Sequence, residues 1–137
     1  MIPIPLHDHI RRQTFWLFTL LLIIANVLAF MFELTTGPNI DRLVFYFGLI
    51  PIRYTNPHLV AEAGVPGLLV PIFTSMFLHG GWLHLLGNML FLFVFGRSIE
   101  DRFGHLKFLF IYFLGCLGGA LLHTFLNAGS RIPTIGA

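Results

Sequence analysis

The sequence predicts an all-α, polytopic membrane helix bundle, and its composition is the first observation behind this prediction. Of the 137 residues, 10% are charged, 56% are hydrophobic and 16 are phenylalanine. The mean hydropathy is +0.83, whereas a soluble domain has about 25% charged residues and about 45–50% apolar ones. Three long apolar runs are the second observation, because a helix of about 20 apolar residues crosses a bilayer. A chain of this length therefore makes one membrane domain, or part of one, with three or four spans.

Charge and cysteine content give no sign of nucleic-acid binding or of an intrachain disulfide. The formal net charge of +2 reflects a shortage of acidic residues and no basic patch, so nothing in the chain indicates nucleic-acid binding. The single cysteine, Cys116, lies within an apolar run and has no partner for an intrachain disulfide. We interpret it as a small packing residue.

The first span is expected at residues 15–32, after a polar tail of residues 1–14. Every residue from Phe15 to Phe32 is apolar except Thr19 and Asn26, and about 18 residues give roughly 27 Å of helix. We expect Asn26 to hydrogen-bond within the bundle. No cleavage site follows this run, so it is expected to remain in the membrane.

Residues 33–70 are expected to form a long extracytoplasmic loop. Four prolines interrupt this segment, and its apolar patch at residues 43–50 is too short to cross a bilayer. A loop of this length with an aromatic patch is unusual as a plain linker. We therefore predict that it lies in the membrane interface, against the helices.

Two further spans are expected at residues 80–96 and 108–126. The charged stretch 97–107 between them is predicted to be a short turn. Gly115 and Gly119 in the third span form a GxxxG pair, which lets another helix approach closely. A fourth span is expected to begin at about residue 134.

Positive charges predict the orientation of these spans. Five of them lie in the tail and in the 97–107 turn: Arg11, Arg12, Arg97, Arg102 and Lys107. Three lie in the long loop and after the third span: Arg42, Arg53 and Arg131. Because Lys and Arg concentrate on the cytoplasmic side, the N-terminus and the short turn are expected there and the long loop outside.

His84 and Asn88 are the most informative polar residues of the apolar segments. They lie four residues apart, so on a helix their side chains share one face. Polar groups are costly in such a segment unless they are satisfied or used. Spacing alone leaves two interpretations open, which are a functional site and hydrogen bonding between helices.

A metal or haem site is a third interpretation of the histidines. It would use His79, His84 and His123 as ligands. His79 and His84 are five residues apart, a spacing that does not place two ligands on one helix face. Metal sites in bundles need ligands that converge from facing helices, so we expect no metal and no cofactor.

The stretch from Phe77 to Met89, with its His-Gly-Gly-x-x-His-x-x-x-Asn pattern, resembles the rhomboid intramembrane serine proteases. The similarity continues through Gly96, the Glu-x-Arg-x-Gly turn at Glu100 to Gly104 and the glycine-rich third span. It covers most of the chain after the tail. One departure is Val70-Pro71, where many members have a Trp-Arg pair.

The resemblance implies a six-helix core, sometimes with a seventh helix, that cuts single-span membrane proteins without metal or cofactor. A serine in a Gly-x-Ser-Gly motif at the start of the fourth helix is the nucleophile, and a histidine on the sixth helix is its base. Gly136-Ala137 match the two residues before that serine. The resemblance therefore implies that this chain is the N-terminal part of such a protease and is inactive alone.

The remaining site residues carry over by motif. His84 and Asn88 match the residues that stabilise the oxyanion in the family, and His79 matches a supporting histidine. Structural matches are Glu100, Arg102, Gly104, Gly115 and Gly119. We expect an integral protein of the bacterial inner (plasma) membrane, and the oligomeric state is left open. The alternative is a rhomboid-like pseudoprotease, which binds membrane clients without cutting them.

Overall fold

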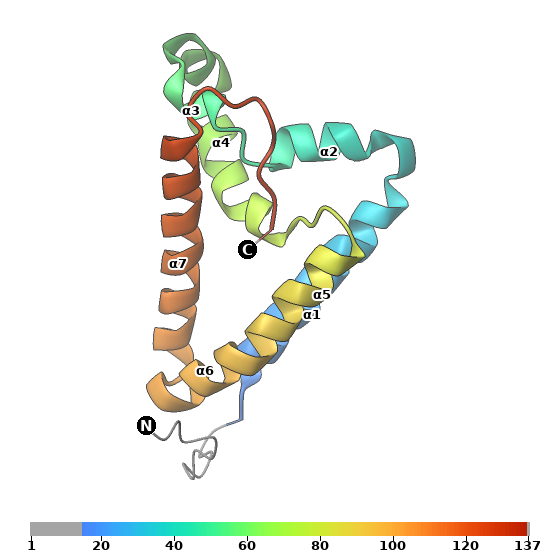
Figure 1. Ribbon diagram of the computed structural model, residues 1–137, viewed down its shortest axis with the longest axis vertical. Helices are drawn as coiled ribbons and strands as arrows, with labels where there is room; N and C mark the ends of the chain where they lie inside the picture. Colours follow the sequence, from blue (N-terminus) through green and yellow to red (C-terminus); the bar gives the residue numbers. More distant parts are fainter. Residues whose placement is uncertain (1–14, 137) are drawn as a thin grey trace, which may run out of the picture.

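The computed structural model describes residues 15–136, and within them the chain is built from helices (Figure 1). The predicted all-α helix bundle is confirmed. The α-helices are α1 (Leu17–Thr35), α2 (Ile40–Phe47), α3 (Ile52–Thr55), α4 (Pro57–Thr74), α5 (Trp82–Phe91), α6 (Arg97–Phe103) and α7 (His105–Leu126). A π-helix, Leu92–Gly96, joins α5 to α6 without a break. The predicted tail at residues 1–14 and Ala137 lie outside the described residues.

Three long elements set the arrangement of the molecule. α1 runs alongside α5, and α7 contacts α1 at its first residue, His105, and diverges from the pair beyond it (Figure 1). α6 joins the pair to α7 at one end, and α4 contacts α7 at the other end. The C-terminal segment after α7 returns between these elements, where Thr134 forms an antiparallel bridge with Leu49.

Four helical segments are long and apolar enough to cross a membrane: Leu17–Thr35, Pro57–Phe77, Trp82–Phe103 and His105–Leu126. Many of their apolar side chains face outward. Leu106 and Phe125 of α7, for example, are 80% and 81% exposed. Such surfaces suit contact with lipid, so the chain is an integral membrane protein.

Residues 33–70, predicted to be an extracytoplasmic loop in the membrane interface, are largely helical, and their position relative to the membrane stays a prediction. This segment contains α2, α3 and most of α4. Its prolines are compatible with helix because Pro57 occupies the first turn of α4, where no backbone N–H is needed, and Asn56 caps that turn. Gly64, with φ +64° and ψ 177°, breaks α4 into two pieces, and Pro66 lies in the first turn of the second piece.

The predicted turn at residues 97–107 was also too long. The helix that begins at Trp82 continues to Phe103, and only Gly104, with φ +83°, interrupts it before α7. The charges of this stretch do not end the helix, because Glu100 is buried and hydrogen-bonded. The first helix likewise continues past the predicted end at residue 32 to Thr35, since Glu33 is buried and bonded.

The small-residue face of α7 has no helix against it within residues 15–136. A Cβ built on Gly115 or on Gly119 would meet nothing within 4 Å. The predicted GxxxG contact therefore stays a prediction. Residues 134–136 are not helical, so the fourth span expected at about residue 134 also stays a prediction.

Candidate functional site

The candidate site lies at the N-terminal end of α5, where a short connection from α4 enters the helix. His79 in this connection is 3% exposed. Its backbone N–H donates to the Glu33 carboxylate of α1, at 3.0 Å from Oε1 and 3.3 Å from Oε2. Its ring Nδ1 lies 3.0 Å from the Phe77 carbonyl oxygen. The end of α1 thus holds the segment that carries His79.

His84 and Asn88 extend from α5 beside this histidine. The Asn88 amide nitrogen Nδ2 lies 3.2 Å from His79 Nε2. The His84 ring stands nearly edge-on to the His79 ring, with centroids 5.3 Å apart. The structure therefore brings together three of the residues that the sequence singled out: His79, His84 and Asn88.

Gly136 completes the cluster from the other end of the chain. It has φ +93°, and a Cβ built on it would lie 2.5 Å from His84 Cε1, 2.6 Å from His84 Nε2 and 3.4 Å from Asn88 Nδ2. Its backbone N–H donates to the Ser75 carbonyl oxygen at 2.8 Å. Only a glycine fits this close approach in this backbone conformation. Gly136, the residue before Ala137, is thus held directly against His84 and Asn88.

The extended segment before Gly136 is fixed by hydrogen bonds to the 49–55 region. The Thr134 N–H donates to the Leu49 carbonyl oxygen at 2.7 Å, and the Leu49 N–H donates to the Thr134 carbonyl oxygen at 3.1 Å. The Ile52 N–H donates to the Ser130 carbonyl oxygen at 3.0 Å. The approach of Gly136 to the α5 residues therefore follows from backbone pairing.

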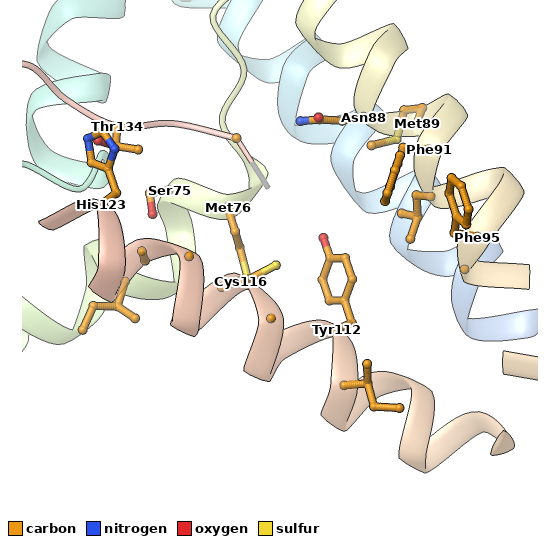
Figure 2. Close-up of a pocket in the computed structure, with 18 of the residues that line it drawn as sticks. Ser75, Met76, Asn88, Met89, Phe91, Phe95, Tyr112, Cys116, His123 and Thr134 are labelled. Atoms are coloured by element: carbon orange, nitrogen blue, oxygen red, sulfur yellow. The ribbon is translucent and has the colours of Figure 1, made fainter. Parts of the chain in front are cut away.

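A cavity of about 470 Å³ opens beside the cluster, between α5 and α7 (Figure 2). Asn88 extends into it from α5, and the Tyr112 hydroxyl points into it from α7. Ser75, Met76, Cys116 and His123 also line it. Its walls are mainly apolar, and Gly115 and Gly119 contribute to the α7 wall. Hydrogen-bond donors in such a cavity face little competition from water.

A second polar cluster lies at the opposite end of the helix pair, around Glu100. This carboxylate is fully buried and accepts from the Phe18 N–H at 2.8 Å, from the Thr19 N–H at 2.8 Å and from Thr19 Oγ1 at 2.7 Å. His105 Nδ1 also contacts it. The first N–H groups of a helix lack acceptors within the helix, and the Glu100 carboxylate is the acceptor for two of those of α1. Gly104 provides the turn that follows, and Arg102 lies on the same short helix. The structure does not bring these residues to the candidate site.

Sequence reasoning missed two residues of the candidate site. Glu33 was treated only as the first residue of a loop, and Ser75 was not singled out. An isolated acid at the end of an apolar run was the one available signal for Glu33. Ser75 acts through its backbone carbonyl, which any residue type provides, so its type gave no signal.

The metal interpretation of the histidines requires ligands that converge, and these were sought within residues 15–136. No group of three or more His, Cys, Asp or Glu side chains is placed there to hold a metal ion. His123 lies near the end of α7, where its carbonyl oxygen accepts from Asn127 Nδ2 at 3.0 Å. The geometry of the cluster instead suits stabilisation of a negative charge, because imidazole and amide N–H groups are hydrogen-bond donors.

Comparisons with known proteins give a consistent result. Residues 66–137 match the family described as the Rhomboid domain. The chain is similar to RHOMBOID-like protein 6, mitochondrial, of Arabidopsis thaliana, with 29% identity across 96% of this chain and 50% of that protein. It is also similar to Rhomboid-like protease 1 of Toxoplasma gondii, with 35% identity across 54% of this chain and 24% of that protein.

A third relative is RHOMBOID-like protein 1 of Arabidopsis thaliana, with 37% identity across 48% of this chain and 17% of that protein. The chain thus spans half or less of the length of these relatives. They come from a plant and an apicomplexan, so they do not support the expected bacterial inner membrane.

Proposed function

Because the chain belongs to the rhomboid family, we propose that it forms the oxyanion-stabilising part of an intramembrane serine endopeptidase. The observation that carries this proposal is the meeting of His84, Asn88 and Gly136 beside the cavity between α5 and α7. In the full-length protein, the nucleophilic serine directly follows Ala137, and a histidine on a later helix is its base. The substrates are single-span membrane proteins.

The proposed reaction goes through an acyl-enzyme. The serine oxygen attacks the carbonyl carbon of the scissile peptide bond while the histidine base takes the serine proton. The carbonyl oxygen becomes negatively charged, and N–H donors of His84 and Asn88 stabilise it. The tetrahedral intermediate then expels the amine, which takes the proton from the histidine. Water, deprotonated by the same histidine, hydrolyses the resulting ester and restores the serine.

The electrostatic reason for these roles is preorganisation. Asn88 and His84 are held on a helix, and Asn88 extends into a mainly apolar cavity. Donors that are already in place need little rearrangement when charge develops, and one such donor is commonly worth about 2.7–4 kcal/mol. No metal or cofactor takes part in the proposed reaction. The 137-residue chain alone is expected to be inactive, because the proposed nucleophile and base are not among its residues.

Orientation in the membrane is part of the proposal. We propose that the N-terminus and the region around Gly104 lie in the cytoplasm, because Lys and Arg are more frequent there than in the other connections. The end of the bundle that carries His79 and Gly136 then lies near the outer face. Cleavage is accordingly expected near that face.

A fluorophosphonate probe tests the proposal on the full-length protein in detergent. Such a probe reacts only with an activated serine, so we expect one labelled serine, directly after Ala137. Replacement of that serine by alanine should abolish both labelling and cleavage of a single-span substrate. A folded full-length protein that is not labelled and that binds membrane clients intact would be a pseudoprotease, and the proposal would be wrong.

A further inference from the structure

We propose that His79 is a positioning residue that selects the orientation of the Asn88 amide and points one amide N–H at the developing oxyanion. This inference rests on the function proposed above for Asn88. His79 itself does not contact the reacting atoms. It acts through the hydrogen bond between its ring and the Asn88 side chain.

The first step of the argument is the tautomer of His79. Its Nδ1 lies 3.0 Å from the Phe77 carbonyl oxygen, which can only accept a hydrogen bond. Nδ1 therefore carries the ring proton, and in the neutral ring Nε2 is left as an acceptor. The neighbouring backbone thus determines which ring nitrogen faces Asn88.

The second step is the orientation of the Asn88 amide. Its Nδ2 lies 3.2 Å from His79 Nε2, so the amide nitrogen donates to the ring. The rotated amide would place the Oδ1 lone pairs against the Nε2 lone pair, which is repulsive. An asparagine amide on a helix has two orientations of nearly equal shape, and His79 removes one of them.

The third step is the N–H group that remains. An amide nitrogen carries two hydrogens, and one of them is used by His79. Within residues 15–136, the other makes no hydrogen bond that the structure records. Asn88 Nδ2 lies 3.4 Å from the position of a Cβ on Gly136, two residues before the proposed serine. The second N–H is therefore available where the oxyanion would form.

The fourth step is the support of His79. Its backbone N–H donates to the buried Glu33 carboxylate at the end of α1, and a charged acceptor makes such a bond stronger. The Phe30 ring of α1 lies edge-on to the His79 ring, with centroids 6.5 Å apart. The chain of contacts from Glu33 through His79 to Asn88 thus connects α1 to the α5 donor.

A purely structural role for His79 makes different predictions from a positioning role. Loss of a structural contact lowers stability whether or not Asn88 is present. Loss of positioning lowers kcat with little change in KM, because the affected bond forms only in the transition state. It also has no further effect once the Asn88 amide has been removed.

The test uses full-length protein with His79→Leu and His79→Gln, each with Asn88 and with Asn88→Ala. We expect His79→Leu to lower kcat by about 10- to 100-fold, a fraction of the loss on removal of an oxyanion donor. We expect His79→Gln to recover most of kcat, because the glutamine oxygen can accept from Asn88. His79→Leu should cause no further loss in the Asn88→Ala protein. His58→Gln, at an exposed position on α4, is the matched control and should match the wild type.

Two results would overturn the inference. One is an equal loss of kcat from His79→Leu with and without Asn88, and the other is a His79→Gln protein as impaired as His79→Leu. If the wild-type full-length protein cuts nothing, the proposed function fails, and ¹⁵N spectra of labelled histidine decide the positioning separately. We expect a His79 signal with Nδ1 protonated and an Nε2 signal that shifts on Asn88→Ala. A ring protonated at Nε2 would contradict the inference in either case.

Discussion

The two ends of the paired helices α1 and α5 differ in how they use buried polar groups (Figure 1). At the α6 end, the Glu100 carboxylate accepts from three donors of α1 and contacts His105. At the other end, the Glu33 carboxylate of α1 accepts the His79 N–H, and Asn88 keeps a donor that faces a cavity. Both carboxylates join distant segments. The second end thus places a side-chain donor, that of Asn88, against a cavity.

The two ends therefore suit different roles, one in stability and one in the proposed chemistry. A polar group whose bonds are all made inside the protein stabilises the fold and cannot respond to a substrate. A donor that is fixed in place and still unpaired can stabilise a charge that appears later. Substitutions at the two ends should accordingly change different measured quantities.

Glu100→Gln should have the largest effect, on stability. The glutamine keeps one acceptor oxygen and places an NH₂ group against donors of α1 that Glu100 now accepts. Two donors of Thr19 bond to Glu100 Oε2, and each hydrogen bond to a charged acceptor is worth about 1.5–3 kcal/mol. We expect a decrease of this size in the free energy of unfolding of the full-length protein, measured by thermal unfolding in detergent.

The control for Glu100 is Glu62→Gln, at an exposed position on α4. An exposed substitution away from specific contacts changes stability by about 0.5 kcal/mol or less. Equal melting temperatures for the two variants would mean that the Glu100 cluster does not hold α1 to α6.

Asn88→Ala should lower activity and leave stability nearly unchanged. Loss of one oxyanion donor lowers kcat by about 100- to 1,000-fold, or about 2.7–4 kcal/mol. KM should change little, since the contact forms in the transition state. Steady-state cleavage of a single-span substrate by the full-length protein measures both constants.

The control for Asn88 is Asn127→Ala. Asn127 lies four residues after His123, the same spacing as His84 and Asn88, but it is exposed at the end of α7 and bonds to His123. We expect wild-type kcat from it. A change in KM alone for Asn88→Ala would make Asn88 a substrate-binding or packing residue.

Gly136→Ala should lower activity somewhat less. The added Cβ would lie 2.5 Å from the His84 ring, and the φ of +93° is unfavourable for alanine, so the segment must move. A shift of about 1 Å in a catalytic group can cost about 100-fold in rate. Gly129→Ala, which meets nothing within 4 Å and has no positive φ, should retain wild-type activity. Equal activities of the two variants would show that Gly136 does not place the nucleophile.

The sequence predicted those parts of the site that are local. His84 and Asn88 share a helix face because of their spacing, so their juxtaposition required no knowledge of the fold. Glu33 and His79 are 46 residues apart, and Glu100 and Thr19 are 81 apart. Such pairs depend on which helices pack together, and no periodicity in one segment reports that. The charges at residues 97–103 indicated a turn for the same reason, since only packing shows that Glu100 is buried.

The helices of residues 33–70 were missed for a different physical reason. A proline in the interior of a helix breaks it, whereas a proline in the first turn is favourable. Composition does not distinguish these two positions. Pro57 and Pro66 both lie in first turns, on either side of the break at Gly64. The cap at Asn56 was the local signal that could have identified the start of α4.

The pH dependence of stability should show the smallest effect, through His79. Burial lowers the pKa of this ring below its ordinary value of 6.5, and the neighbouring His84 lowers it further, although the Phe77 carbonyl opposes both. The unfolded chain then binds a proton at a higher pH than the folded one. Stability is therefore fully present above about pH 6.5 and falls as the pH drops toward the lowered value.

A comparison of unfolding midpoints of the full-length protein between about pH 7.5 and 5 measures this contribution. Glu33 on α1 and His84 on α5 also face His79, and both residues are present in every variant compared. The wild type should lose more stability on acidification than His79→Gln, which has no titrating group at this position. His58→Gln should retain the wild-type slope. Parallel curves for the wild type and His79→Gln would mean that His79 is not held as the neutral acceptor that Asn88 requires.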